Sequence, residues 1–200
     1  QSVHHIIERA ETENDLSEIR LFYKDIATTN NWTLSGQFDY ITSDGELIDF
    51  KVTSAWSALD ALQNGKDEWE EQLNILDFLV RKNPDKVNIK INKLYIIAIL
   101  RDWSKLQASK SDNYPQAQVV KIPIKLWSEE EQEHFIKERI KLHQQSEITE
   151  PDICTPKERW RKEDSFAVMK DGRKSALRVL PTLEKAKQYL TENNMQEGKG

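Results

Sequence analysis

Two aspartates and a lysine lie on neighbouring segments that have the pattern of a β-hairpin. The segments are Gly36–Ile41 and Leu47–Thr53, and a short polar stretch joins them. Side chains alternate between the two faces of a strand, so Asp49 and Lys51 lie on one face of the second segment. Asp39 reaches that same face only if the two strands pair in one particular register.

The turn between the strands decides this register. A two-residue turn would pair Tyr40 with Asp49 and would put Asp39 on the wrong side. A three-residue loop, 43–45, instead pairs Asp39 with Asp49, and its last position favours a glycine such as Gly45 in the left-handed conformation. We therefore expect two carboxylates about 5 Å apart at Cβ. Lys51, opposite Gln37, comes next along the same face.

The other face of this hairpin is predicted to be apolar. Its members are Phe38, Tyr40, Ile48, Phe50 and Val52. An apolar face of this kind packs against a core and leaves the carboxylates and the lysine on the opposite side.

Two carboxylates at this separation repel each other unless a cation lies between them. Mg²⁺ accepts one or two protein carboxylates and keeps coordination sites for water and phosphate oxygens; Mn²⁺ accepts similar ligands. Such an ion acidifies a bound water for attack on phosphorus. Lys51 could orient or deprotonate that water, or offset charge in the transition state. The residues thus predict phosphodiester hydrolysis; the alternative is an amphipathic hairpin with ordinary surface charges.

With these residues in place, the chain resembles the PD-(D/E)XK nuclease superfamily. More narrowly, it is similar to the RecB-like exonuclease branch and its phage-encoded relatives. The segments that carry the resemblance are Val3-His4, Leu34–Asp39, Asp49-Phe50-Lys51, Glu70–Asn74, and Cys154 with Arg159-Trp160 and Ala167–Lys170. Two positions depart from the pattern: Phe38 replaces a proline, and Leu76 stands where a tyrosine is expected.

The resemblance implies a role for each matching residue. The implied metal ligands are His4, Asp39, Asp49 and the backbone carbonyl of Phe50, and the implied catalytic residues are Asp39, Asp49, Lys51 and Gln72. Lys51 would be the catalytic lysine, and Gln72 would contact the scissile region or orient Lys51. The cofactor would be one or two Mg²⁺ or Mn²⁺ ions.

The expected fold is α/β (α+β), a restriction-endonuclease-like core whose central mixed sheet is flanked by helices. We expect the core over 1–146 and a linker with a small β-β-α extension over 147–200. The elements predicted from periodicity and caps are helices over 2–10, 67–82, 128–143 and 182–193, and strands over 18–26, 36–41, 47–53, 93–100, 118–126, 166–169 and 176–180. Strand 93–100 is expected to be buried on both faces. Pro123 indicates an edge strand or a bulge.

Composition limits the class of protein. The single cysteine, Cys154, excludes an internal disulfide and cannot by itself hold zinc or an iron–sulfur cluster, and we expect it to be buried. No apolar run approaches the roughly 20 residues of a membrane span. We expect no membrane association and a cytoplasmic location, in a bacterial or phage-infected host cell. Trp56 and Trp103 are expected to pack, although either could serve as a base platform.

The net charge of −5 argues against a non-specific DNA coat protein, but not against an enzyme whose acidic groups hold metal. The tail is locally basic, and its candidate DNA contacts are Arg159, Trp160, Lys170, Arg173 and Lys174. A solvated tail is the alternative.

The expected function is cleavage of linear double- or single-stranded DNA, by a phage-type exonuclease of recombination, repair or genome processing. Two alternatives are a structure-selective or nicking endonuclease and a catalytically vestigial DNA-binding or assembly module. Whether the partners include further copies of this chain or a recombination protein is open.

Overall fold

The computed structural model describes residues 15–24, 32–151, 153–156, 158, 159, 161, 163–193 and 195. The predicted helix over 2–10, with His4, lies outside these residues. The chain divides into two compact units, Gln1–Gln145 and Ser146–Gly200. Each unit is described by itself below.

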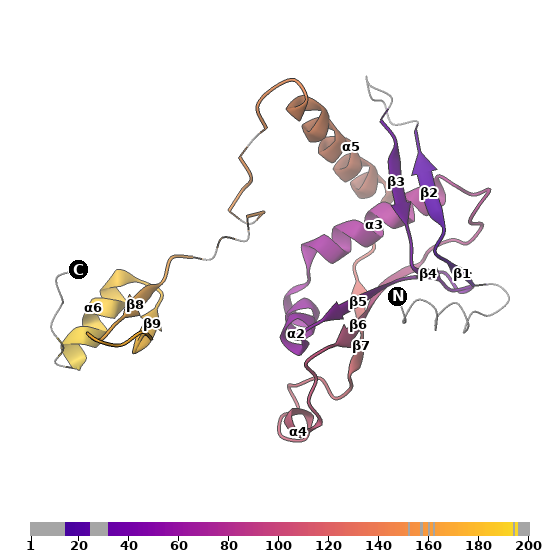
Figure 1. Ribbon diagram of the computed structural model, residues 1–200. Coiled ribbons are helices and arrows are strands. Elements are labelled where there is room, and N and C mark those ends of the chain that lie inside the picture. The colour runs from indigo at the N-terminus through magenta and orange to yellow at the C-terminus, as the bar shows by residue number, and fades with distance from the viewer. Residues whose placement is uncertain are drawn as a thin grey trace. The chain divides into compact units, whose positions relative to one another are not determined.

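A five-stranded mixed sheet forms the centre of the first unit (Figure 1), in the order β1-β4-β5-β6-β7. Its strands are β1 Leu16–Ser17, β4 Tyr40–Ile41, β5 Glu46–Thr53, β6 Lys93–Leu100 and β7 Val119–Ile124. The long strands β5 and β6 pair in parallel, and the other pairs are antiparallel. β7 is at the edge, as Pro123 predicts.

Two more strands form a separate antiparallel pair, β2 Arg20–Tyr23 with β3 Leu34–Gln37. The predicted strand over 18–26 is present as the shorter β2, whereas the prediction of a single strand over 36–41 is wrong. In the first stretch Glu18, at φ +51°, stands between β1 and β2. In the second, β3 pairs with β2 whereas β4 pairs with β1 and β5, so the chain changes partner between residues 37 and 40.

The turn before β5 has the predicted register. Tyr40 pairs with Ile48 and Ile41 with Leu47, which continues to Asp39 opposite Asp49. Gly45 has a φ of +82°, the left-handed conformation that the three-residue loop requires. The expectation that Gln37 faces Lys51 is wrong, because Gln37 pairs with Arg20 of β2.

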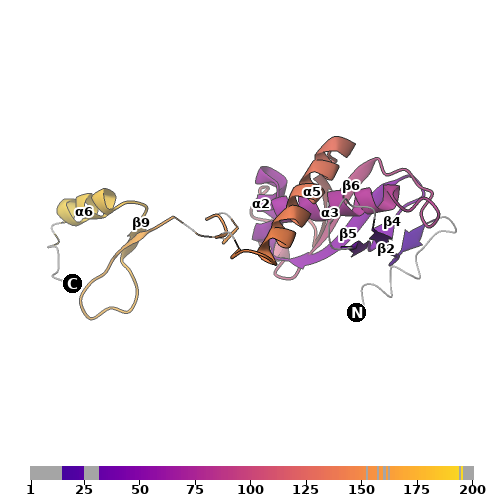
Figure 2. The ribbon, with the colours of Figure 1, turned by 90° about the horizontal axis from the view of Figure 1, so that it is seen from above.

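Helices flank the sheet. They are α2 Ala55–Asn64, α3 Asp67–Arg81, α4 Lys105–Ala108 and α5 Glu129–Ser146. α2 was not predicted; it starts at an N-cap in which Ser54 accepts from the N–H of Ser57. α5 starts with the predicted capping box, in which Ser128 and Glu131 accept from each other's backbone N–H. Figure 2 shows α5 beside α3, to which polar side chains tie it.

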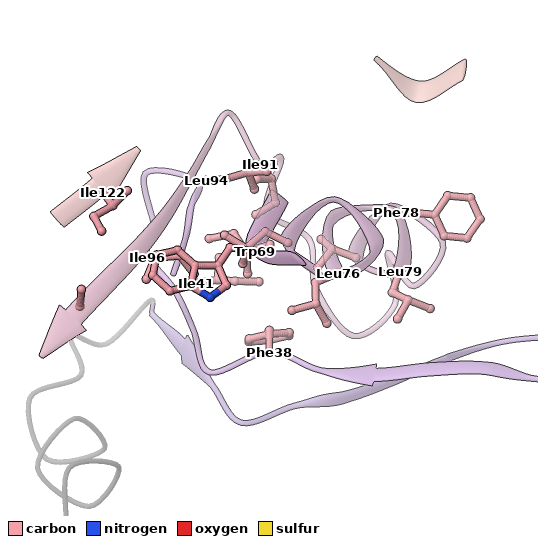
Figure 3. Close-up of a cluster of buried hydrophobic side chains, with 14 of the residues drawn as sticks. Phe38, Ile41, Trp69, Leu76, Phe78, Leu79, Ile91, Leu94, Ile96 and Ile122 are labelled. Carbon is pink, nitrogen blue, oxygen red and sulfur yellow. The ribbon is translucent and has the colours of Figure 1, made fainter. Parts of the chain in front are cut away.

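The core lies between the sheet and α3. Figure 3 shows Phe38 next to Leu76 and Leu79 of this helix, and all three side chains are buried. The opposite sheet face is less covered: alternate residues of β6 are only half-buried, so the prediction of burial on both faces is wrong. The prediction that the apolar face of the hairpin over 36–53 packs on the core and leaves the charged residues on the other side is wrong. Val52 is 65% exposed, whereas Asp49 and Lys51 contact Gln72 of α3 and therefore lie on the side of the sheet that packs on this helix.

The second unit contains a hairpin and a helix, namely β8 Phe166–Val168, β9 Arg178–Leu180 and α6 Leu183–Glu192. Thr182 caps α6 as predicted, by accepting from the N–H of Lys185. Cys154 is exposed, not buried as expected, because it lies in the stretch without helix or strand that precedes this hairpin. Among the described residues, no helix has the length and apolar character that a membrane span needs.

Candidate active site

Asp49, Lys51 and Gln72 make mutual polar contacts between β5 and α3. The Nζ of Lys51 lies 2.8 Å from Asp49 Oδ2 and donates to Gln72 Oε1 at 3.0 Å. The Nε2 of Gln72 donates to Asp49 Oδ1 at 2.8 Å. The amide oxygen of Gln72 therefore accepts from the lysine, and its amide nitrogen donates to the carboxylate. These two bonds hold all three side chains in one arrangement.

Strand alternation and helix periodicity bring these residues together. Asp49 and Lys51 are two apart on β5, so both point toward the helix layer. On α3, Gln72 lies next to the fully buried Leu73, at the margin of the face that packs on the sheet. The packing of Leu73 thus fixes the height and rotation at which Gln72 meets the strand.

Asp39 lies immediately before β4, the strand that pairs with β5. Its Oδ2 accepts a hydrogen bond from the backbone N–H of Phe50 at 2.9 Å. This bond holds the carboxylate against the strand next to Asp49, with which it interacts electrostatically. The predicted pair of carboxylates is thus present, and the Phe50 backbone lies between them.

Burial raises the pKa of Asp49 above its ordinary value of 3.8. The side chain is only 4% exposed, and desolvation disfavours its charged form. The neighbouring Lys51 opposes this rise, whereas the negative charge of Asp39 adds to it. A cation at this place would favour the ionised form of Asp49.

The donor set fits a hard divalent cation. Asp49 Oδ2 is buried, and the Lys51 ammonium contacts it at 2.8 Å. A buried carboxylate beside a second carboxylate suits Mg²⁺ or Mn²⁺, which bind through one or two protein carboxylates. Within the described ranges, no group of three or more His, Cys, Asp or Glu residues could hold a metal. The third predicted side-chain ligand, His4, lies outside those ranges.

The predicted DNA contacts of the tail belong to the second unit, and one of them lies outside the residues that the structure describes. Trp160 is among the residues that are not described, and the other four are exposed. These four are Arg159, Lys170, Arg173 and Lys174.

Further residues that support the site were not singled out from the sequence. On either side of Gln72, Glu70 accepts from the indole N–H of Trp127, and Asn74 accepts from its backbone N–H at 2.9 Å. These bonds anchor α3 to the segment after β7. An aromatic residue just before a capping box is the signal that could have suggested such an anchor. Trp56, expected to pack, is 74% exposed on α2, whereas the half-buried Trp103 donates to the carbonyl of Pro115.

No family model and no curated protein matches this chain. Among solved structures, the chain is similar to the crystal structure of SSO0001, with 14% identity and a TM-score of 0.43. The similarity covers 70% of this chain and 57% of that one, so this chain spans less than two thirds of its length.

Proposed function

We propose that this protein is a metal-dependent nuclease that hydrolyses phosphodiester bonds in DNA at Asp39, Asp49 and Lys51. The proposal includes the finer fold assignment, in which the mixed α/β unit that ends at residue 145 is a PD-(D/E)XK core. The observation that carries it is the bridging of Lys51 and Asp49 by the Gln72 amide, beside a second carboxylate.

The arrangement favours catalysis over an ordinary ion pair on the surface. An exposed ion pair adds little to the free energy of unfolding and does not need a third residue to hold it. At this site the Gln72 amide contacts both partners of the pair. Here the aspartate is buried at a net cost, which its raised pKa reflects. A buried carboxylate with a raised pKa beside a charged partner is typical of sites that bind a ligand or perform chemistry.

Each residue has a separate task. Asp39 and Asp49 provide the oxygen ligands, and the Phe50 N–H keeps the Asp39 carboxylate in place. Lys51 provides a positive charge near the reacting phosphate and donates a proton or a hydrogen bond to its oxygens. Gln72 keeps the lysine ammonium near Asp49 before substrate binds. When bound, Mg²⁺ or Mn²⁺ supplies Lewis acidity toward the phosphate and lowers the pKa of water.

The decisive experiment compares linear, end-labelled DNA with closed circular DNA. Each substrate is incubated with Mg²⁺, Mn²⁺ or EDTA, and with wild type, Lys51→Ala or Asp49→Asn. As a matched control we choose Lys141→Ala, an exposed lysine of α5. We expect metal-dependent loss of the linear DNA, abolished by both site variants and retained by the control.

The other outcomes have definite meanings. Cleavage of the circular DNA would indicate the endonuclease alternative within the same fold. An absence of cleavage on both substrates, with folded protein and retained DNA binding, would refute the nuclease and favour a DNA-binding or assembly module. Cleavage that survives Lys51→Ala and Asp49→Asn would assign the activity to other residues.

A further inference from the structure

A small two-stranded arm leads into the candidate site. It consists of β2 and β3, and we call it the β2–β3 arm. Its inner face contacts α3: Leu21 is fully buried, and a Cβ on Gly36 would come within 2.8 Å of Leu76 Cδ2 and 2.9 Å of Leu79 Cδ1. Its outer face consists of the exposed residues Arg20, Phe22, Ser35 and Gln37.

The arm ends next to the proposed catalytic carboxylate Asp39. Gly36 faces α3, so strand alternation directs Gln37, the last residue of β3, to the opposite side. Asp39 follows two residues later, where the chain passes from β3 to β4. The base of the arm is fixed at this point, because the N–H of Glu18 donates to the carbonyl of Asp39 at 3.2 Å. Phe22 pairs with Ser35, four residues before Asp39, which corresponds to about 13 Å along an extended strand.

The outer face is cationic. Arg20 contacts a neutral partner, the hydroxyl of Ser35 at 3.5 Å, and the Nζ of Lys86 lies 5.6 Å from the centre of the Phe22 ring. In the described part of the chain, neither cation has a carboxylate within ion-pairing distance. The neighbouring Lys82 differs, because Glu133 neutralises it at 3.1 Å. Arg20 and Lys86 are therefore available to an anionic ligand.

An apolar ring accompanies these cations. Phe22 is 47% exposed although Leu21, next to it on the strand, is fully buried. Unneutralised cations beside an exposed aromatic ring are the combination with which proteins bind unpaired nucleic-acid strands: cations contact phosphates and rings stack on bases. A base-paired duplex offers phosphates but hides the faces of its bases.

We propose that the outer face of the β2–β3 arm binds an unpaired DNA strand and directs it to Asp39. Arg20 and Lys86 contact the phosphates, and Phe22 stacks on a base. This inference rests on the proposed function in naming DNA as the ligand, and it adds a strand preference and a path to the site.

The test measures binding without cleavage. Fluorescence anisotropy in EDTA, over a range of salt concentrations, compares a labelled single-stranded oligonucleotide with a blunt duplex of the same sequence. The full-length variants are Arg20→Ala, Lys86→Ala and Phe22→Ala. The matched controls are Lys141→Ala for the lost charge and Val119→Ala for the lost apolar side chain, which is 53% exposed on β7. Thermal melting verifies that every variant is folded.

Each variant has its own expected signature. Arg20→Ala and Lys86→Ala should each weaken single-strand binding about 10-fold and reduce the salt slope by about 0.7. Phe22→Ala should weaken single-strand binding about 10-fold without changing the salt slope, and should leave duplex binding nearly unchanged. The two controls should bind as wild type.

Failure of the arm and failure of the nuclease give different results. If folded arm variants bind the single strand as wild type does, or if wild type does not bind it, the arm proposal is refuted. If Phe22→Ala weakens duplex and single-strand binding equally, the assignment to an unpaired strand is refuted. If wild type never cleaves DNA with metal but the arm variants lose binding as expected, the arm stands and the nuclease proposal fails.

Discussion

Gln72 donates its side-chain amide to Asp49 across 2.8 Å, and this bond joins the helix α3 to the strand β5. Because its carbonyl oxygen also accepts from Lys51, a change at this one residue should disturb both charged groups. It would do so without removing a charge or a core side chain. Gln72 is thus the position at which catalysis and folding are best separated.

The first prediction concerns Gln72→Ala. We expect kcat for DNA cleavage to fall about 100-fold with little change in KM, because a small misplacement of reacting groups costs that much. The protein should stay folded with a loss of stability of about 1–3 kcal/mol, because the buried Asp49 loses a donor. DNA binding in EDTA should remain as in wild type. The matched control is Gln63→Ala, an exposed glutamine of α2, which should cleave normally. A normal kcat in Gln72→Ala would contradict the positioning role.

The second prediction concerns the pH dependence that Asp49 gives to stability. Its pKa is raised above 3.8 by burial, so between 3.8 and the folded-state pKa the folded protein holds more protons than the unfolded chain. Stability contributed by this group therefore falls as pH rises through that window. Asp49→Asn, neutral at every pH, should melt higher than wild type at pH 7, and the difference should vanish at acid pH.

Melting curves from pH 3.5 to 8 in EDTA check this expectation. Asp44→Asn, at an exposed turn position, is the control and should change the curve little. Added Mg²⁺ should raise the melting temperature of wild type and leave Asp49→Asn unaffected, because a ligand stabilises the form that binds it. A wild type that melts higher than Asp49→Asn at pH 7 in EDTA would mean that the ion pair with Lys51 outweighs burial.

The third prediction concerns the turn that sets the register of the two carboxylates. Gly45→Ala meets two obstacles: a φ of +82°, and a Cβ that would lie 2.3 Å from the Lys90 carbonyl oxygen and 2.8 Å from Asn92 Nδ2. We expect a loss of stability of about 2 kcal/mol or more. Gly65→Ala is the matched control, because its φ is +74° and nothing lies within 4 Å. Equal losses in urea unfolding would show that the close approach costs nothing.

The register at Gly45 could be predicted because it depends on local rules. Side-chain alternation on two short segments and the needs of a three-residue loop both favoured Asp39 opposite Asp49. The division of the predicted strand over 36–41 into β3 and β4 could not be predicted, because it depends on pairing with β2, which comes earlier in the chain. The exposure of Val52 also depends on what covers the sheet, and no strand pattern contains that information.

The contacts of Gln72 were only partly predictable. Resemblance suggested a glutamine near Lys51, but the simultaneous bond to Asp49 depends on how α3 packs over β5. The polar side chains that tie α5 to α3 gave no signal, because a buried glutamine and an exposed one look alike in a charged helix. Gln132 is an example: it is only 1% exposed, in a helix whose other residues are mostly polar or charged.

The fourth prediction concerns this buried glutamine. The Nε2 of Gln132 donates to Asp77 Oδ2 at 2.8 Å and to Asn74 Oδ1 at 3.2 Å, while its Oε1 accepts from Arg81. Gln132→Leu would leave these groups without that partner, at a cost of about 1–3 kcal/mol for a buried polar group. Burial already raises the pKa of Asp77, and the bond from Gln132 opposes that rise. The variant should raise this pKa further, so its loss of stability should be larger at pH 7.5 than at pH 4.

Urea unfolding at both pH values measures the difference, with Gln63→Leu on exposed α2 as the control. A loss that is equal at both pH values would mean that the glutamine contributes packing alone and does not stabilise the ionised carboxylate.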